Sequence, residues 1–505
     1  MVFTRRYTEW NISLNMKGDS WKIHVQYLVR KCSRRINFLT SIVGSWWGAH
    51  PTTMLTLYKT TILSVLEYGC FVFMSTANTH MLKIARIQYR CLRICLGSMG
   101  STHNMSLEVV AGVLPLYLRF NELACRFLVT AHVNDTQLIH KLDGLFEINP
   151  ESKFLTSYRE CFSLPTRKSN SIRYFELEDC TRMFVMNIDL SIHAELIKVP
   201  EFMIHRILPA LCNEKFSEYA SENIIFTDGS VIETHSGFGA HSLREQSFYQ
   251  LEQPCSIFVA EMTAIYFVCQ RILTYPPEKY LICSDSFSSL VALRSIKVNS
   301  KTNPIIFELR KLVFELINKR YDLKFLWVPS HSHIIGNEHA DSLAKKGAME
   351  GEIFERNIEC TEFFPEIAKR AYDHWQQIWD KDTMSRHCFS IFPNVSKKPW
   401  FHLLNVDRTF IRDMTRIIVN HYCLNSHLYR IKLTESNMCP CGKGYEDIDH
   451  LTWDCELYAE YRAELMTSLE SKSRSKMPIR DLLGLKDVEA MKIFHRFLKR
   501  TKIKL

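Results

Sequence analysis

Residues 221–350 contain a succession of short apolar segments and longer helical segments that restricts this part of the chain to a mixed α/β fold. Three strand-like segments come first, and strand-like and helix-like segments alternate after them. Short apolar runs rich in β-branched and aromatic residues are typical of buried strands. This order predicts a mixed five-stranded sheet with helices packed on it. The expected strands are 224–227, 236–240, 246–251, 279–283 and 323–328, and the expected helices are 256–273, 304–320 and 338–346.

Four acidic residues fall at or near the ends of these elements. Asp228 and Asp285 each follow a strand. Glu261 lies one turn into a helix, and Asp341 lies on the last helix. Carboxylates that converge at strand ends repel one another unless a cation lies between them, and oxygen ligands without thiolates favour Mg²⁺ or Mn²⁺. The pattern indicates a site for two such ions about 4 Å apart that hydrolyses a phosphate ester, although many α/β domains have acids at strand ends.

The chain of 505 residues has a formal net charge of +9 that is concentrated at its two ends. Residues 1–100 hold 13 Lys and Arg against 3 Asp and Glu, and residues 491–505 hold six Lys and Arg and no acid. Two basic ends suggest a polyanionic partner, although a solvated basic surface has the same composition. The 17 glycines are about half the usual share, which favours a helix-rich protein, and the length suggests about three domains.

One predicted helix, over 81–96, carries a basic stripe. Its cations are spaced three and four residues apart, so they share one helical face: Lys83, Arg86, Arg90 and Arg93. Like charges on one face repel, and a nucleic-acid phosphate backbone would offset this repulsion. An ordinary exposed basic face is the alternative.

The 17 cysteines are an odd number scattered over the chain. The first residues show no apolar core of signal-peptide length, and no stretch of 18 apolar residues occurs, so we expect an intracellular protein without a membrane segment. Its compartment, cytoplasmic or nuclear, is left open. Cysteines in such a protein are reduced thiols, core residues or metal ligands. Cys269 and Cys283 lie in apolar runs and are predicted to be core residues.

A Cys/His cluster near the carboxyl end has the ligand set of a tetrahedral zinc site. Its spacing is C-x-C-x8-H-x4-C, and its members are Cys439, Cys441, His450 and Cys455. The single residue between the first two cysteines is tighter than the common two. A set of free thiols in a helical hairpin is the alternative. Trp453 inside the motif is expected to pack in the interior, and stacking on a base is the alternative.

Four local motifs in order over about 120 residues resemble ribonuclease H type 1. They are Phe226-Thr227-Asp228-Gly229-Ser230, Ala260-Glu261, Ser284-Asp285-Ser286, and the segment from Trp327 to Asp341. The resemblance implies a ribonuclease H-like fold in which Asp228, Glu261, Asp285 and Asp341 are the catalytic, metal-binding acids. It also implies that His331 is the loop histidine that assists proton transfer or product release. His333 departs from the family, which usually has Gly there, so loop mobility is expected to differ. A competing hypothesis makes His331, His333 and His339 zinc ligands with Asp341.

The flanking segments are similar to parts of non-LTR retrotransposon reverse-transcriptase polyproteins. Residues 1–135 resemble a helical thumb through Leu66-Glu67-Tyr68-Gly69, Gln88-Tyr89-Arg90-Cys91-Leu92-Arg93 and related motifs. In that family the thumb grips the template–primer duplex. The Cys/His cluster at 439–455 resembles the motif found after the ribonuclease H domain in many of these elements. We therefore expect a thumb-like remnant over 1–135, a connector over 136–220, a ribonuclease H domain over 221–350, and a helical region over 351–505.

These features predict an enzyme, an endonuclease that hydrolyses the RNA strand of RNA–DNA hybrids with two Mg²⁺ or Mn²⁺ ions, and a zinc ion in the Cys/His cluster. No Asp-Asp dipeptide occurs in the sequence, so we expect no polymerase activity. The alternative is a catalytically silent nucleic-acid-binding relic of a retrotransposon. A resolvase or an exonuclease of the same general fold is disfavoured by the motif from His331 to Asp341. The expected partner is an RNA–DNA hybrid or another nucleic acid, and the oligomeric state is left open.

Overall fold

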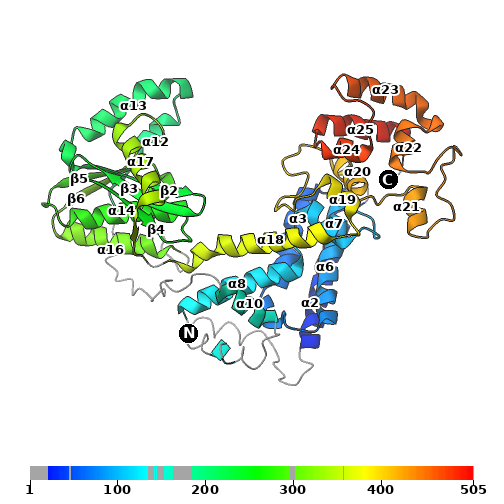
Figure 1. Ribbon diagram of the computed structural model, residues 1–505, viewed down its shortest axis with the longest axis horizontal. Helices are drawn as coiled ribbons and strands as arrows, with labels where there is room; N and C mark the ends of the chain where they lie inside the picture. The colour runs from blue at the N-terminus through cyan, green and yellow to red at the C-terminus, as the bar shows by residue number, and fades with distance from the viewer. Residues whose placement is uncertain are drawn as a thin grey trace. The chain divides into compact units, whose positions relative to one another are not determined.

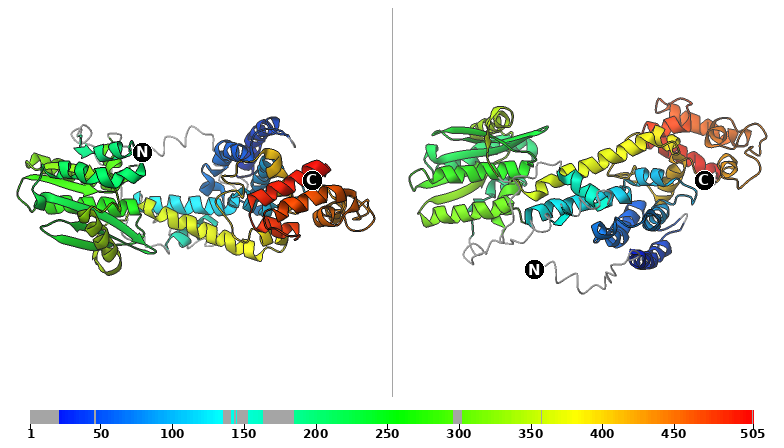
Figure 2. Two further views of the ribbon diagram at one scale, coloured as in Figure 1. Left: turned by 90° about the horizontal axis from the view of Figure 1, so that it is seen from above. Right: turned by 60° about the horizontal axis from the view of Figure 1, so that its bottom comes forward.

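The computed structural model describes residues 21–44, 47–134, 141–142, 144, 153–162, 185–295, 302–356, 358–503 and 505. The chain divides into two compact units (Figures 1 and 2). The helical unit comprises Met1–Cys125, Asn149–Tyr158 and Ile367–Leu505, and the sheet unit comprises Arg126–Ile148 and Arg159–Glu366. Within the described residues, no helix has both the length and the apolar character that crossing a membrane requires.

The sheet unit is built on one mixed sheet. Its strands are β1 (Ile188–Asp189), β2 (Ile224–Ile232), β3 (His235–His241), β4 (Gln246–Leu251), β5 (Lys279–Ser284), β6 (Asp322–Trp327) and β7 (Glu352–Phe354). They lie in the order β1-β6-β5-β2-β3-β4-β7. The pairs β2–β3 and β3–β4 are antiparallel, and the other neighbours are parallel. All five predicted strands are present, but the sheet has seven strands instead of five. The edge strands β1 and β7 are two and three residues long, too short to show a periodic pattern.

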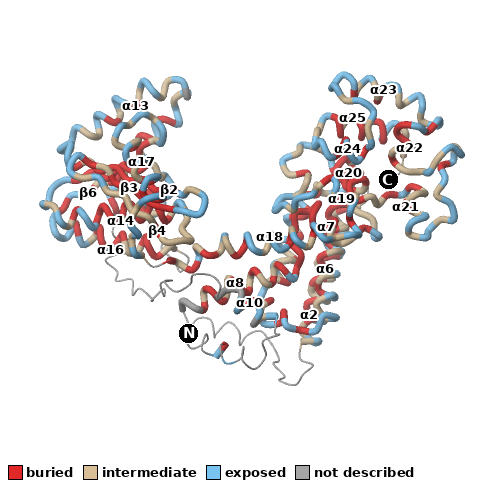
Figure 3. Tube along the Cα trace, viewed as in Figure 1, coloured by how far each residue is buried: buried red, intermediate tan, exposed pale blue. Residues whose placement is uncertain are grey.

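Helices cover both faces of this sheet. They are α12 (Ser191–Leu196), α13 (Glu201–Phe216), α14 (Ile257–Ile272), α15 (Phe287–Arg294), α16 (Pro304–Asn318) and α17 (Ile335–Glu350), with short 3-10 turns η3 (Ser221–Asn223) and η4 (Cys360–Phe363). Successive strand residues point to opposite faces. On β5, Tyr280 and Ile282 pack in the core that contains α14 and α16. Leu281 and Cys283 pack in the core with α12, α13 and α17. The burial colours of Figure 3 show the buried sheet between these layers. Cys283 and Cys269 are fully buried, as predicted.

Part of the 136–220 segment, which we expected to be a connector, belongs to the sheet unit. β1 pairs with β6 in parallel, and Ile192 and Leu208 from α12 and α13 pack on the sheet. Asp189, at the end of β1, forms two ion pairs through its Oδ2 atom, with Lys215 Nζ at 3.3 Å and with Lys324 Nζ at 3.1 Å. These contacts anchor residues 185–216 to the strands that carry the acids. Residues 136–140, 143, 145–152 and 163–184 of the same segment lie outside the described residues.

The helical unit combines helices from both ends of the chain. From the amino-terminal part come α2 (Trp21–Ser41), α3 (Pro51–Tyr58), the π-helix η1 (Lys59–Leu63), α4 (Ser64–Glu67), α5 (Cys70–Phe73), α6 (Asn78–Leu96), α7 (Asn104–Ala111), α8 (Leu116–Asn134) and α10 (Lys153–Phe162). From the carboxyl-terminal part come α18 (Phe364–Lys381), α19 (Arg386–Ile391), α20 (Arg408–Ile418), α21 (Asn425–Arg430), α22 (Ile448–Trp453), η5 (Glu456–Tyr458), α23 (Ala459–Glu470), α24 (Ile479–Gly484) and α25 (Val488–Thr501). One hydrophobic core joins the two sets, so the chain up to Cys125 and from Ile367 onward, parts of two segments that the sequence suggests are separate, share a folding unit.

Arginines of α20 hold the carboxyl end of α6 in this core. The last carbonyls of a helix have no partner within the helix and carry partial negative charge. The Arg408 guanidinium donates to the carbonyls of Ile94 and Cys95 at 3.1 Å each, and Arg416 Nε donates to the Gly97 carbonyl at 2.9 Å. These bonds join residues more than 300 positions apart, which explains why no local sequence pattern reveals them.

Candidate active site

Three of the predicted acids converge where β5 ends beside β2. β2 is longer than the predicted strand 224–227 and continues to Ile232, so Asp228 lies inside this strand rather than after it. β2 and β5 are parallel neighbours with Thr227 opposite Ser284, so Asp228 and Asp285 follow at matching positions. Glu261 reaches them from α14, which approaches β2 closely at Gly229. A Cβ at Gly229 would lie 2.5 Å from the Glu261 amide nitrogen, so only glycine fits there. One carboxylate oxygen of each acid lies within 4.8 Å of the others.

The electrostatics of these three acids fit a divalent cation. Burial, followed by the charges of Asp285 and Asp341, raises the pKa of Asp228 to about 8. Burial and the Asp228 charge raise the pKa of Glu261 well above its ordinary value, and burial raises the pKa of Asp285. The buried Oε2 of Glu261 has no hydrogen-bond partner among the described residues. Buried, unpaired carboxylate oxygens are costly without a cation, and an all-oxygen set suits Mg²⁺ or Mn²⁺.

Asp341 belongs to a neighbouring group. On α17, one of its oxygens lies within 4.8 Å of ligand atoms of His331 and Glu338, and Lys345 pairs with its Oδ2 at 2.7 Å. Its charge nevertheless raises the pKa of both Asp228 and Asp285, so it acts on the other acids. The three-acid group thus contains Asp228, Glu261 and Asp285, with Asp341 beside it.

The loop before α17 has an unusual backbone. His331 and His333 adopt left-handed conformations with φ of +49° and +59°, which favour glycine. The His333 amide donates to Glu338 Oε1 at 3.3 Å. A side chain in this conformation costs about 1 kcal/mol or more, so a histidine at 333 strains a position that glycine occupies freely. The metal-ligand group at this loop contains His331 without His333 or His339, and His339 instead contacts His241 at 3.3 Å.

Several supporting residues were not singled out from the sequence. Asn337 is buried, and its amide donates to Asp285 Oδ2 at 3.2 Å. The Trp327 indole donates to the Asp285 carbonyl at 3.0 Å. The His193 ring from α12 stacks on Phe287 with centroids 4.1 Å apart and meets Trp327 edge-on. Asn337 and Trp327 stand within the recognised motif, where their polar side chains were a usable signal. His193 carried no such signal, because its contacts depend on the docking of α12.

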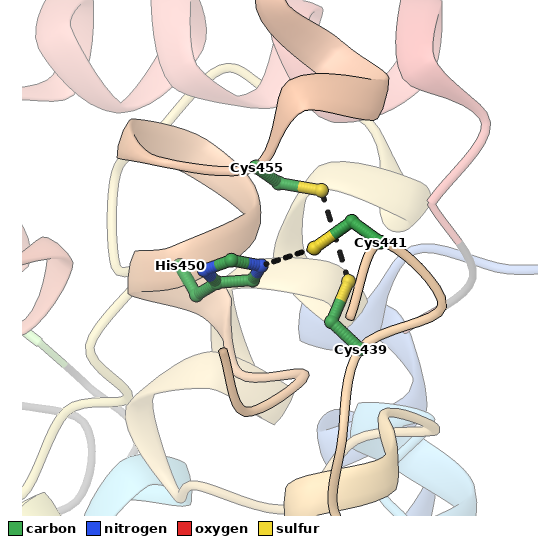
Figure 4. Close-up of side chains that lie close together, drawn as sticks. All are labelled: Cys439, Cys441, His450 and Cys455. Atoms are coloured by element: carbon green, nitrogen blue, oxygen red, sulfur yellow. Dashed lines mark hydrogen bonds between the residues drawn. The ribbon is translucent and has the colours of Figure 1, made fainter. Parts of the chain in front are cut away.

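The Cys/His cluster brings its four predicted residues together (Figure 4). Cys439 Sγ and Cys455 Sγ lie 3.7 Å apart, and Cys441 Sγ lies 3.2 Å from His450 Nε2. All four ligand atoms lie within 4.8 Å of one another. A zinc tetrahedron with Zn–S bonds of about 2.3 Å has edges of about 3.7 Å, so these residues fit a zinc ion.

Local hydrogen bonds fix the backbone of this cluster, Cys439 to Cys455, which we call the Cys/His knuckle. The Cys439 amide donates to the Gly444 carbonyl at 2.8 Å, and Gly442 adopts a φ of +76°, so the chain turns tightly with one residue between two cysteines. The Lys443 amide donates to Cys441 Sγ and lowers the pKa of Cys441 to about 7, which favours the thiolate that zinc requires. Trp453 is buried in the core of the helical unit, which agrees with the packing role we expected.

The basic stripe divides into exposed and internal members. Lys83, Arg86 and Arg90 are exposed on α6. Arg93 is half-buried and donates to the Thr102 carbonyl and to Asn104 Oδ1, each at 2.8 Å. Three of the four cations are therefore free to face a ligand along the helix, whereas Arg93 also holds the loop that follows α6.

Comparisons with known proteins agree with the geometry of the sheet unit. Residues 220–349 match the family model described as RNase H. The chain is 22% identical over 215 residues to the Retrovirus-related Pol polyprotein from type-1 retrotransposable element R1 of Popillia japonica, covering 42% of this chain and 81% of that protein. It is 28% identical over 96 residues to the corresponding polyprotein of Bradysia coprophila, covering 19% of this chain and 9% of that protein.

Solved structures also resemble part of the chain. RNase H1 from Halobacterium salinarum is 17% identical, with a TM-score of 0.21, and the match covers 25% of this chain and 95% of that protein. The Protease-Reverse Transcriptase of Prototype Foamy Virus is 23% identical, with a TM-score of 0.23, and the match covers 26% of this chain and 21% of that one. The family match, the mixed sheet and the order of the motifs agree: residues 220–349 form an RNase H domain, in a chain homologous to the Pol polyproteins of R1 retrotransposable elements.

Proposed function

We propose that this chain is an endonuclease that hydrolyses the RNA strand of RNA–DNA hybrids. The observation that carries the proposal is the convergence of Asp228, Glu261 and Asp285. All three carboxyls have raised pKa values, Asp228 and Glu261 are buried, and Oε2 of Glu261 has no hydrogen-bond partner among the described residues. These residues, with Asp341, would hold two Mg²⁺ or Mn²⁺ ions. When bound, such ions supply activation of the attacking water and stabilisation of the departing 3′-oxygen.

The chain's own residues orient the site. Asn337 and Trp327 hold the side chain and the carbonyl of Asp285, so this carboxylate is fixed before substrate arrives. His331 is exposed on the strained loop beside Asp341, where its imidazole can carry a proton between the site and solvent. Specificity for a hybrid would come from contacts to the 2′-hydroxyls of one strand and to the DNA backbone of the other. Because the sequence contains no Asp-Asp dipeptide, we propose hydrolysis and no polymerisation.

A cleavage assay with the full chain tests this function. An RNA–DNA hybrid labelled on both strands is incubated with Mg²⁺, with Mn²⁺, with Ca²⁺ or with no added divalent ion. We expect the RNA strand to be cut with Mg²⁺ or Mn²⁺ while the DNA strand, single-stranded RNA and duplex DNA stay intact. A folded chain that binds the hybrid but never cuts it would favour the catalytically silent relic.

The exposed part of the basic stripe should contribute to binding. Changing Lys83, Arg86 and Arg90 together to Ala should weaken hybrid binding and flatten its salt dependence, because each lost phosphate contact lowers the slope of log K against log salt by about 0.9. Fluorescence anisotropy at a series of salt concentrations measures both quantities.

A triple Ala variant of exposed lysines elsewhere in the helical unit is the matched control for this stripe: Lys397, Lys398 and Lys472. It removes the same net charge from other positions. If the two triple variants show the same slope of log K against log salt, the stripe is an ordinary solvated surface and does not contact the nucleic acid.

A further inference from the structure

A second cationic cluster lies in the helical unit, apart from the acids and from the zinc ligands. It is formed by the end of α6, the loop that leads into α7, and the segment from Asn420 through α21. Its members are Arg93, Ser101, His103, His421, His427 and Arg430. Residues from the amino-terminal and carboxyl-terminal segments therefore build it together.

Hydrogen bonds join the members of this cluster. Ser101 Oγ lies 3.1 Å from His421 Nδ1 and 3.4 Å from His427 Nε2, and the two imidazole nitrogens lie 3.0 Å apart. His427 Nδ1 lies 2.6 Å from the Tyr422 carbonyl, which can only accept, so this nitrogen carries a proton. The Arg430 guanidinium donates to the Asn420 carbonyl. These bonds hold the groups in fixed positions.

The fixed charges that act on His421 are two guanidiniums, Arg93 and Arg430. Burial, followed by His427, Arg430, His103 and Arg93, lowers the pKa of His421 to about 3. One carboxylate touches the edge of the group, where Asp382 accepts the amide of Ser385, whose hydroxyl contacts His103 Nδ1 at 2.7 Å. The guanidiniums of Arg93 and Arg430 both lie near enough to act on His421, and an anion between them would be attracted to both.

The end of α6 and the loop between α6 and α7 contain buried polar atoms that lack a hydrogen-bond partner among the described residues. Thr102 is 2% exposed, and its hydroxyl has no hydrogen-bond partner among the described residues. Ser98 Oγ and Arg93 Nε are likewise buried and unpartnered in the described part of the chain. The amino terminus of α7 begins at this loop, and its N-cap His103 makes no side-chain bond to the helix amides. Unsatisfied buried polar groups indicate a missing water or ion, and helix amino termini attract anions.

We propose that this cluster is a phosphate-binding site that holds the backbone of a nucleic-acid strand through Ser101 and Arg430, with Arg93 behind them. Ser101 and Arg430 are exposed, so a phosphodiester can reach them. The site lies at the end of α6, whose exposed Lys83, Arg86 and Arg90 lead toward it.

The Cys/His knuckle adjoins the same site. In α21, the backbone N–H of Asn425 donates to Glu446 Oε2 at 2.7 Å, and the side-chain Nδ2 of Asn425 donates to the Met438 carbonyl at 3.0 Å. A strand held at the cluster would therefore pass close to the knuckle. The choice of nucleic acid as the ligand rests on the proposed function, whereas the binding itself does not depend on hydrolysis.

Ser101→Glu tests the site, because it places a carboxylate among the cations. In the full chain with Asp228→Asn, which prevents cleavage, we expect the affinity for a labelled RNA–DNA hybrid to fall about tenfold and the salt slope to fall by about 0.9. The melting temperature should stay the same or rise, since the new carboxylate is attracted to Arg93 and Arg430. Ser471→Glu, an exposed serine after α23, is the matched control and should bind as the parent does. Parallel titrations with single-stranded RNA and duplex DNA identify which backbone is held.

A second measurement keeps the proposal testable if Ser101→Glu folds poorly. Arg430→Gln should weaken binding in the same direction, and inorganic phosphate should raise the melting temperature of the parent more than chloride does at equal ionic strength. Unchanged hybrid affinity in a folded variant at either position would overturn the site. If the parent chain never cleaves a hybrid but these variants bind the hybrid more weakly, the phosphate-binding site stands and the proposed hydrolysis is refuted.

Discussion

Asp228→Asn should reduce cleavage of an RNA–DNA hybrid by roughly 1,000-fold, which corresponds to about 4 kcal/mol of transition-state stabilisation. The amide keeps the shape of the side chain but removes the charge at the centre of the acid cluster, where Asp228 lies beside both Glu261 and Asp285. Single-turnover cleavage with Mg²⁺ measures the loss. Cleavage near the parental rate would show that the hydrolytic site lies elsewhere.

Although Asp228→Asn should slow cleavage, it should raise the stability of the protein when no divalent metal ion is present. The folded-state pKa of Asp228 is raised to about 8, so its stability contribution is lost as the pH rises from about 4 toward 8. Asparagine avoids this loss. At pH 8 without divalent ions, the variant should therefore melt about 2–4 °C higher than the parent, as expected for 1 kcal/mol in a domain of this size.

With Mg²⁺ present, the parent should melt at a higher temperature than the Asp228→Asn variant. Added ions should stabilise the parent by mass action and should stabilise the variant little, because one of the charged ligands is gone. Melting curves of both proteins with and without Mg²⁺ measure the crossover. Equal responses of the two proteins to Mg²⁺ would argue against a cation among these acids. Glu352→Gln, an exposed acid on the edge strand β7, is the control for the loss of one negative charge.

Cys441→Ser should abolish zinc binding and destabilise the helical unit as a whole. Cys439, Cys455 and Leu451 pack in the core that also contains α6 and α20, so the knuckle is part of that core rather than an appendage. Loss of the ion should lower the melting temperature of this unit by roughly 10 °C or more, because structural zinc supplies several kcal/mol of folding free energy. Elemental analysis of protein purified without added zinc should give one zinc per parental chain and none in the variant.

The zinc prediction has a matched control in the same unit. Cys423 is exposed and stands outside the cluster, so Cys423→Ser should retain the zinc and the stability of the parent. Hybrid cleavage should persist in Cys441→Ser at temperatures where the sheet unit stays folded, since its predicted ligands are carboxylates. Well-folded parental protein without zinc would make Cys439, Cys441 and Cys455 ordinary thiols.

The sequence by itself determined the central sheet and the convergence of three acids. Asp228 follows a short apolar run inside β2, and Asp285 directly follows the apolar run of β5, so the signal for each strand is local. The spacing of the Cys/His cluster is local as well, because its four residues lie within 17 positions of one another. The Cys/His cluster can be read from the sequence because its ligands are neighbours in the chain. The acids meet only through the pairing of β2 with β5 and the packing of α14 on β2.

Only the tertiary structure decided which distant segments meet. The edge strand β1 is too short to have a signature, and its place beside β6 depends on pairing across more than 130 residues. Arg93 has the same helical spacing as Arg86 and Arg90, yet it turns inward because Thr102 and Asn104 supply acceptors. Arg408 satisfies carbonyls of α6 more than 300 residues earlier in the chain. Such contacts follow from the burial of apolar faces and the satisfaction of polar groups in three dimensions, which local periodicity does not encode.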